Sequence, residues 1–202
     1  MTVTRTRAVL VALTATATLA LTACGGDDGA DTAHASHSAA ASATASAGAH
    51  NAQDVAFAQT MIPHHQQALE MASLAADRAS SAQVKDLAAR IEKAQDPEIN
   101  TMTGWLKAWG EDVPMAGMDH SGHAGMAGMM SDKDMTMLKQ AKGKDFDTMF
   151  LTMMVQHHQG AVEMAGTEKA KGDYGPATSM ADSVVTAQNA EIKEMNKLLG
   201  KG

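Results

Sequence analysis

Two pairs of adjacent histidines are the residues of this chain best suited to chemistry. His64 and His65 lie in the stretch FAQTMIPHHQQALEMA, and His157 and His158 lie in FLTMMVQHHQGAVEMA. Methionines flank each pair, and imidazole nitrogen together with thioether sulfur is a ligand set that suits copper. The use of these side chains depends on how the fold positions them.

The segment between the two pairs carries a second set of soft ligands. The stretch MAGMDHSGHAGMAGMM, residues 115–130, is rich in glycine and alanine and has no helical period. Its candidate copper ligands are Met115, Met118, His120, His123, Met126, Met129 and Met130. Exposed thioethers oxidise readily, so a loop that keeps so many of them suggests a role in binding Cu(I). Zinc fits less well because the loop has no cysteine. The alternative is a hydrophobic lid, since Met-rich surfaces also bind apolar partners.

The two histidine pairs belong to an internal repeat. Residues 57–106 align with residues 150–199 without a gap, at a constant offset of 93, and sixteen positions are identical. Each unit has the apolar period of two amphipathic helices. The expected helices run from about Ala52 to Arg78, Ala82 to Trp109, Asp145 to Ala170 and Pro176 to Leu199. Pro97 is expected to kink its helix without ending it.

The composition and the repeat together predict an all-α fold. The chain of 202 residues has 17 methionines and is only 3% aromatic, so its apolar residues are mainly good helix formers. One hairpin of about fifty residues buries two amphipathic faces poorly by itself, so the two hairpins should pack together as a four-helix bundle. The bundle is expected to span residues 51–202, with residues 111–134 as its Met-rich connection.

A helical wheel gives the two histidines of each pair different positions. His65 falls in the middle of the apolar arc of its helix, whereas His64 falls at the edge of that arc beside Met71. The second repeat places His158 and His157 in the same way, with Met164 beside the latter. The wheel therefore predicts one core histidine and one histidine at a helix–helix seam in each repeat.

Two carboxylates fall in the apolar arcs of the second helices of the repeats. A carboxylate in such an arc is costly unless it is paired or binds a cation, so Glu98 and Glu191 are the expected partners of His65 and His158. We expect these four groups around a pseudo-two-fold axis. The methionines expected to line them are Met61, Met102, Met154 and Met195. Two interpretations stay open: a metal site, or hydrogen-bonded His–Glu pairs with methionine as core filler.

The N-terminal residues have the pattern of an export signal. Arg5 and Arg7 precede an apolar run that ends in LTAC, which resembles a bacterial lipobox. We expect residues 1–23 to be removed, Cys24 to be lipidated, and residues 24–50 to form a flexible tether. An ordinary secreted protein is the alternative. The net charge of −7 would become −7 − 2 = −9 after cleavage, which argues against nucleic-acid binding.

The stretches MIPHHQQALEMA and MMVQHHQGAVEMA resemble the signature of the DUF305 family, over about residues 51–200. The resemblance implies a ferritin-like four-helix bundle and, for some members, extracytoplasmic copper binding. The motif residues are Met61, His64, His65, Glu70 and Met71, with Met154, His157, His158, Glu163 and Met164. The Glu-X-X-His pairs of di-iron proteins are absent, which argues against ferroxidase chemistry.

These patterns favour a copper-binding lipoprotein on the outer face of the bacterial cell membrane. Such a protein would sequester copper or deliver it to a copper-handling partner, and it would not be an enzyme. Its metal ligands would come from the two repeats, including Glu98 and Glu191, and from the connecting loop. The alternatives are a metal-dependent oxidase or hydrolase, and a metal-free structural or interaction bundle.

Overall fold

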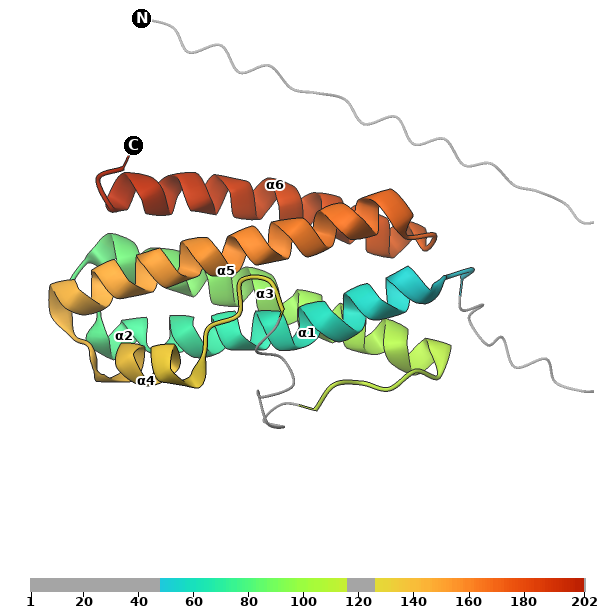
Figure 1. The fold of residues 1–202 in the computed structure, drawn as a ribbon, viewed down its shortest axis with the longest axis horizontal. Helices are drawn as coiled ribbons and strands as arrows, with labels where there is room; N and C mark the ends of the chain where they lie inside the picture. Colours follow the sequence, from blue (N-terminus) through green and yellow to red (C-terminus); the bar gives the residue numbers. More distant parts are fainter. Residues whose placement is uncertain (1–47, 116–125, 202) are drawn as a thin grey trace, which may run out of the picture. The chain divides into compact units, whose positions relative to one another are not determined.

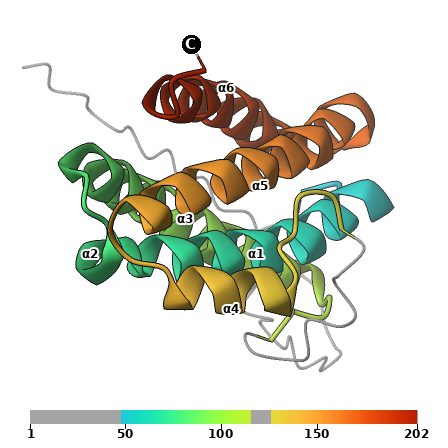
Figure 2. The ribbon, with the colours of Figure 1, turned by 60° about the vertical axis from the view of Figure 1, so that its left-hand side comes forward.

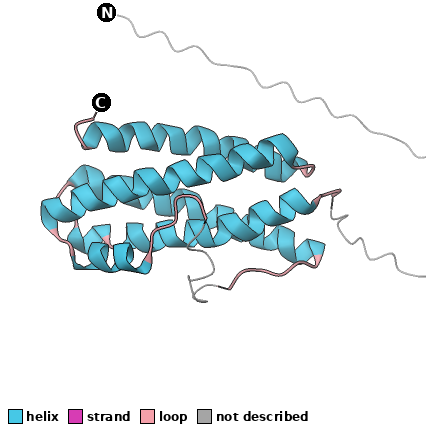
Figure 3. Ribbon diagram, in the orientation of Figure 1, coloured by secondary structure: helices cyan, strands magenta, loops and turns pink. Residues whose placement is uncertain are grey.

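The computed structural model of the protein describes residues 48–115 and 126–201. Within these ranges the regular elements are all helices, apart from an isolated bridge between Ala79 and Gly143 (Figure 3). The helices are α1 (Ala52–Ser73), α2 (Ala75–Arg78), α3 (Ala82–Trp109), α4 (Asp132–Gln140), α5 (Gly143–Lys171) and α6 (Gly175–Leu198). The predicted all-α class is therefore confirmed.

The four long helices form two hairpins (Figure 1). Helix α1 packs along α3, and α5 packs along α6. The two hairpins meet mainly through α1 and α5, which run in opposite directions (Figures 1 and 2). The small side chains Ala68 and Ala161 are fully buried, so these two helices can approach closely. None of the described helices is long and apolar enough to cross a membrane.

The helix ends follow from local sequence. Asn51 and Ser131 begin α1 and α4 with capping boxes, in which the third residue of the helix bonds back to the cap. Gly110 ends α3 in the left-handed conformation, with a φ of 76°, which glycine adopts without strain. Helix α3 continues through Pro97, so the proline does not end it, as the sequence predicted.

Two elements differ from the sequence prediction. The first expected helix is interrupted at Leu74, which separates α1 from the short α2. The expected connection 111–134 ends inside α4, a helix that the repeat did not predict. Helix α4 buries only Met135 and Leu138, and so short an apolar pattern is hard to recognise next to a Met-rich loop.

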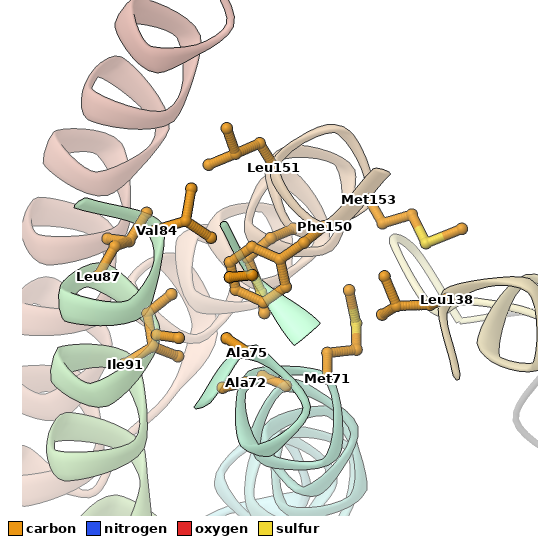
Figure 4. Close-up of a cluster of buried hydrophobic side chains, with 14 of the residues drawn as sticks. Met71, Ala72, Ala75, Val84, Leu87, Ile91, Leu138, Phe150, Leu151 and Met153 are labelled. Carbon is orange, nitrogen blue, oxygen red and sulfur yellow. The ribbon is translucent and has the colours of Figure 1, made fainter. Parts of the chain in front are cut away.

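The apolar core has two parts, one around each repeated phenylalanine. Phe150 lies at the centre of one part, between Ile91 of α3 and Leu138 of α4 (Figure 4). Phe57 belongs to the other part, with Met102, Leu106 and Val184. Because Phe57 and Phe150 are equivalent in the repeat, the duplicated hairpin builds its core twice, once toward each end.

Each hairpin holds the turn of the other through a buried aspartate. Asp147, in α5, accepts hydrogen bonds from the backbone amides of Ser80 (3.1 Å) and Ser81 (3.0 Å). Asp54, in α1, accepts them from the amides of Asp173 (3.2 Å) and Tyr174 (3.0 Å). The two aspartates are 93 residues apart, and so are Ser80 and Asp173, and Ser81 and Tyr174. Because 93 is the offset of the repeat, the two contacts are equivalent. The repeat as aligned from the sequence starts at Phe57 and Phe150, three residues after these aspartates, and so does not include them.

The described end of the expected tether lies against the helices. The His50 ring stacks on Trp109, with ring centroids 4.3 Å apart, and Trp109 meets Tyr174 edge to face. Residues 1–23, Cys24 and the tether up to residue 47 lie outside the described residues, so the predicted signal peptide and lipidation site stay predictions.

Candidate metal site

The edge histidines of the two repeats meet each other. The rings of His64 in α1 and His157 in α5 have centroids 3.7 Å apart and an interplanar angle of 34°. Both side chains are buried, with relative exposures of 0% and 1%. The sequence predicted that each of these histidines lies at a helix–helix seam, beside Met71 or Met164, and the interface of α1 and α5 is such a seam, but the sequence did not predict that the two rings meet. A helical wheel shows the faces of a single helix, whereas the contact between these two rings depends on the packing of two helices against each other.

Among residues 48–115 and 126–201, the four ring nitrogens of His64 and His157 find no hydrogen-bond partner. Burial, followed by the nearby charges of His65 and His158, lowers the pKa of His64 to about 3. Burial likewise holds the pKa of His157 well below its usual range, with His64 as the next cause. Both rings are therefore neutral at pH 7, which is the form that binds metals.

The core histidines have the carboxylate partners that the wheel predicted. His65 Nε2 lies 2.7 Å from Glu98 Oε2, and His158 Nε2 lies 2.8 Å from Glu191 Oε2. Both carboxylates are partly exposed, at 25% and 14% of their side-chain surface, which lowers the cost of their charge. Each pair joins the two helices of one hairpin.

These pairs do not form the single cluster of two His and two Glu that the sequence predicted. The pairs are instead separate, and His64 and His157 occupy the interface between the hairpins. The Nδ1 atoms of His65 and His158 have no hydrogen-bond partner. Within residues 48–115 and 126–201, no three His, Cys, Asp or Glu side chains are grouped as a metal site. Additional ligands would therefore have to include methionine or residues outside these ranges.

Two buried glutamines were not among the predicted site residues. Gln95 and Gln188 are equivalent in the repeat, both are 3% exposed, and the Oε1 atom of each lacks a hydrogen-bond partner. A sequence signal for them exists, because both fall within the apolar arc beside the glutamates and the residue is identical in the two repeats. They extend the set of buried histidine and glutamine atoms without partners among the described residues, and each repeat supplies half of these atoms.

The predicted methionine ligands of the repeats are largely core residues. Met61 and Met102 belong to the core around Phe57, and Met71, Met154 and Met195 belong to the core around Phe150. Met164 is half-buried at the edge of the Phe57 core. The helical wheel placed Glu70 and Glu163 on the polar faces of their helices. In the structure, Glu70 forms an ion pair with Lys139 of α4, with an N–O distance of 2.6 Å.

The end of the Met-rich loop is fixed beside the histidine pair. Gln67 of α1 exchanges two hydrogen bonds with the backbone of Met130, at 2.7 and 2.9 Å. Gly128 has a φ of 80°, and a Cβ atom added there would lie 2.9 Å from the carbonyl oxygen of His157. A Cβ atom on Gly160 would lie 2.0 Å from the oxygen of Ala127. The two glycines therefore permit backbone contact between the loop and α5.

The loop methionines are not all exposed. Met115 is 64% exposed, and Met126 and Met129 are half-buried. Met130 is only 9% exposed and joins the core around Phe150, although the stretch has no helical period that would predict a core residue. Its burial follows from the Gln67 contact. Met118, His120 and His123 lie outside the described residues.

Residues 54–199 match the family described as "Domain of unknown function (DUF305)". The chain belongs to the DUF305 family. Its resemblance to this family, inferred from the two His-His stretches, is thereby confirmed. A comparison with curated proteins found no match.

Solved structures of DUF305 proteins resemble this one. A Streptomyces coelicolor structure, titled as a secreted DUF305 protein, has 33% identity and a TM-score of 0.67, and the match covers 74% of this chain and 93% of that one. A DUF305 fragment from Deinococcus radiodurans has 30% identity and a TM-score of 0.67, over 75% and 98% of the two chains. CopM in its Cu(II)-bound form has 34% identity and a TM-score of 0.63, over 72% and 94%. CopM structures in Cu(I)-bound and Ag-bound forms match as well.

Proposed function

We propose that this DUF305 protein binds copper outside the cytoplasm, as a lipoprotein that sequesters or delivers the metal. The observation that carries the proposal is the contact between His64 and His157. Two neutral imidazoles are buried in contact with each other, tilted by 34°, and their four nitrogens have no partner among the described residues. A buried polar group without a partner is costly, so its retention on both halves of a repeat suggests a ligand.

The donor set fits copper. Neutral imidazole binds Cu(I) and Cu(II), and thioether sulfur favours Cu(I). The fixed end of the Met-rich loop lies against α5 beside His157, so loop donors can approach the histidine pair. That solved CopM structures contain copper and silver supports the same assignment.

The remaining parts of the proposal concern placement and architecture. We assign the four long helices to a ferritin-like four-helix bundle. Residues 1–23 would be a signal peptide, and Cys24 would carry the lipid that anchors the protein to the outer face of the cell membrane. The tether and the exposed Met115 would then lie in the extracytoplasmic space, where the loop can capture copper and pass it to a partner protein.

A metal-free structural role is the second candidate. The observation in its favour is that His65–Glu98 and His158–Glu191 are already hydrogen-bonded through Nε2 and join the helices of each hairpin. This role explains the core histidines, but it leaves the nitrogens of His64 and His157 without a purpose.

Competition for Cu(I) against a chromophoric chelator tests the proposal. We expect wild-type protein to withdraw Cu(I) from the chelator, and a His64→Leu/His157→Leu variant to lose most of this affinity. Replacing Met126 and Met129 with leucine should weaken binding less. The control is Gln59→Ala, a half-buried site on α1 whose side chain bonds to the Asp112 carbonyl, which should leave affinity unchanged. Equal affinity in wild type and the double histidine variant would remove this pair from the account.

A further inference from the structure

A groove of about 930 Å³ lies between α4, α5 and the end of the Met-rich loop. Five methionines line it, and three of them come from the helices rather than from the loop. The five are Met129, Met130, Met137, Met149 and Met153. Neither the repeat nor the proposed histidine site accounts for this concentration of thioethers.

Core packing explains only some of these methionines. Helix α4 buries Met135 and Leu138 toward the core, whereas Met137 is 38% exposed. On α5, Met153 is largely buried and lies on the side of Leu138 in Figure 4, while Met149 is only half-buried. Met137 therefore gains little from burial, and Met149, which packs against the core around Phe150, is buried only in part; both line the groove. Such exposed thioethers call for a reason other than packing.

The other lining residues indicate the charge of the ligand. Asp134, whose carboxylate also caps α4 through Ser131, and Asp145 line the groove with Thr148, Thr152 and Gln156, and the described residues of its lining include no lysine, arginine or histidine. An acidic site without a counter-charge attracts cations. Thioether donors select soft cations over magnesium, calcium or zinc.

We propose that this methionine groove is a separate site for a soft monovalent cation, Cu(I) or Ag(I), with Met137, Met149 and Met153 as its main ligands. It does not require the histidine pair, so it stands or falls independently of the proposed histidine site. An apolar peptide is the competing occupant, because methionine surfaces also bind such partners. The acidic lining favours the cation.

Methionine methyl NMR with Ag(I) as the probe tests this inference in the full-length mature protein. The methyl carbons carry ¹³C, and single Met→Leu substitutions assign the signals. We expect Ag(I) to shift the signals of Met137, Met149 and Met153, in the wild type and equally in the His64→Leu/His157→Leu variant. If the Ag(I)-induced shifts persist in the double histidine variant, the groove binds Ag(I) without the histidine site.

The matched variants are Met137→Leu/Met149→Leu/Met153→Leu and Met180→Leu, a half-buried control on α6 outside the groove. Leucine keeps the apolar volume, so the triple variant should fold, and Met137→Leu alone, at an exposed position, provides a check that does not depend on core packing. We expect the triple variant to bind Ag(I) at this site about tenfold more weakly or worse, and the control to match wild type. Groove signals that stay fixed with Ag(I), or that move only with an apolar peptide, would overturn the proposal.

Discussion

The rings of His64 and His157 lie 3.7 Å apart between α1 and α5, and the two residues are equivalent positions of one repeat. A duplicated hairpin therefore produces two kinds of histidine site. The His–Glu pairs occur once in each hairpin, whereas the edge histidines combine into one shared site at the pseudo-two-fold axis. Among the described residues, neither ring nitrogen of His64 or His157 has a hydrogen-bond partner, whereas His65 and His158 each bond a glutamate through Nε2, and this difference separates binding from structural roles.

The metal-free protein should become more stable when the histidine pair is replaced. His64→Leu/His157→Leu removes four buried nitrogens without partners, each unsatisfied group costing about 1–3 kcal/mol, although changed packing offsets part of the gain. We expect a higher thermal midpoint in the presence of a chelator. His65→Leu is the control and should lower the midpoint, because it leaves Glu98 without its partner. A clear loss of stability in the double variant would mean that the pair has a structural role.

The contact between the loop and α5 should be sensitive to one methyl group. Gly160→Ala places a Cβ atom 2.0 Å from the Ala127 oxygen, so the loop end must move, at a cost of about 1–3 kcal/mol. Gly166→Ala, on the same helix with open space around it, should be neutral or stabilising by up to about 1 kcal/mol. Urea unfolding measures both. Movement of the loop should also make His64 more reactive to a histidine-modifying reagent, and equal reactivity in the two variants would count against the contact.

The reciprocal aspartates should contribute similarly and independently. Asp54→Ala and Asp147→Ala each leave backbone amides of the opposite hairpin without an acceptor, at a cost of roughly 2–4 kcal/mol. The two sites lie near opposite ends of the helices (Figure 1), so their effects on the free energy of unfolding should add in the double variant. Asp112→Ala, at an exposed position, is the control. Strong non-additivity would show that the two contacts are coupled.

The stability of the protein should fall as the pH rises above the ordinary range of a glutamate. Burial, followed by the hydrogen bond and charge of Asp54, raises the pKa of Glu168 from 4.5 to about 8. The folded state therefore holds a proton that the unfolded state has lost, and the stability contributed by this group decreases between about pH 4.5 and pH 8. Glu168→Gln should reduce this pH dependence and raise the thermal midpoint at pH 8. Glu163→Gln, an exposed site on the same helix, should retain the wild-type profile. Parallel profiles for all three proteins would refute the assignment.

Sequence patterns predicted the structural features that depend on a single helix or on the internal repeat. The apolar period predicted the four long helices, and the wheel predicted the contacts His65–Glu98 and His158–Glu191, because the helices of one hairpin pack face to face. The two His-His stretches also identified the family.

The missed features depend on contacts between hairpins. The packing of α1 against α5 is the main contact between the hairpins, and a wheel of a single helix cannot predict which helices of two hairpins meet. The His64–His157 contact follows from that packing. The burial of Met130 depends on Gln67 and on the close approach at Gly160, which are tertiary contacts without a local pattern. Asp54 and Asp147 had a usable signal, because they continue the repeat beyond Phe57 and Phe150.

X-ray absorption at the copper K-edge, on protein loaded with one equivalent of Cu(I), tests the central claim most directly. The account predicts imidazole nitrogen ligands, visible by their characteristic scattering in the wild-type spectrum, and their loss in His64→Leu/His157→Leu. The His65→Leu variant should retain them. A wild-type spectrum with sulfur ligands alone, unchanged by the double substitution, would contradict the assignment of copper to the histidine pair.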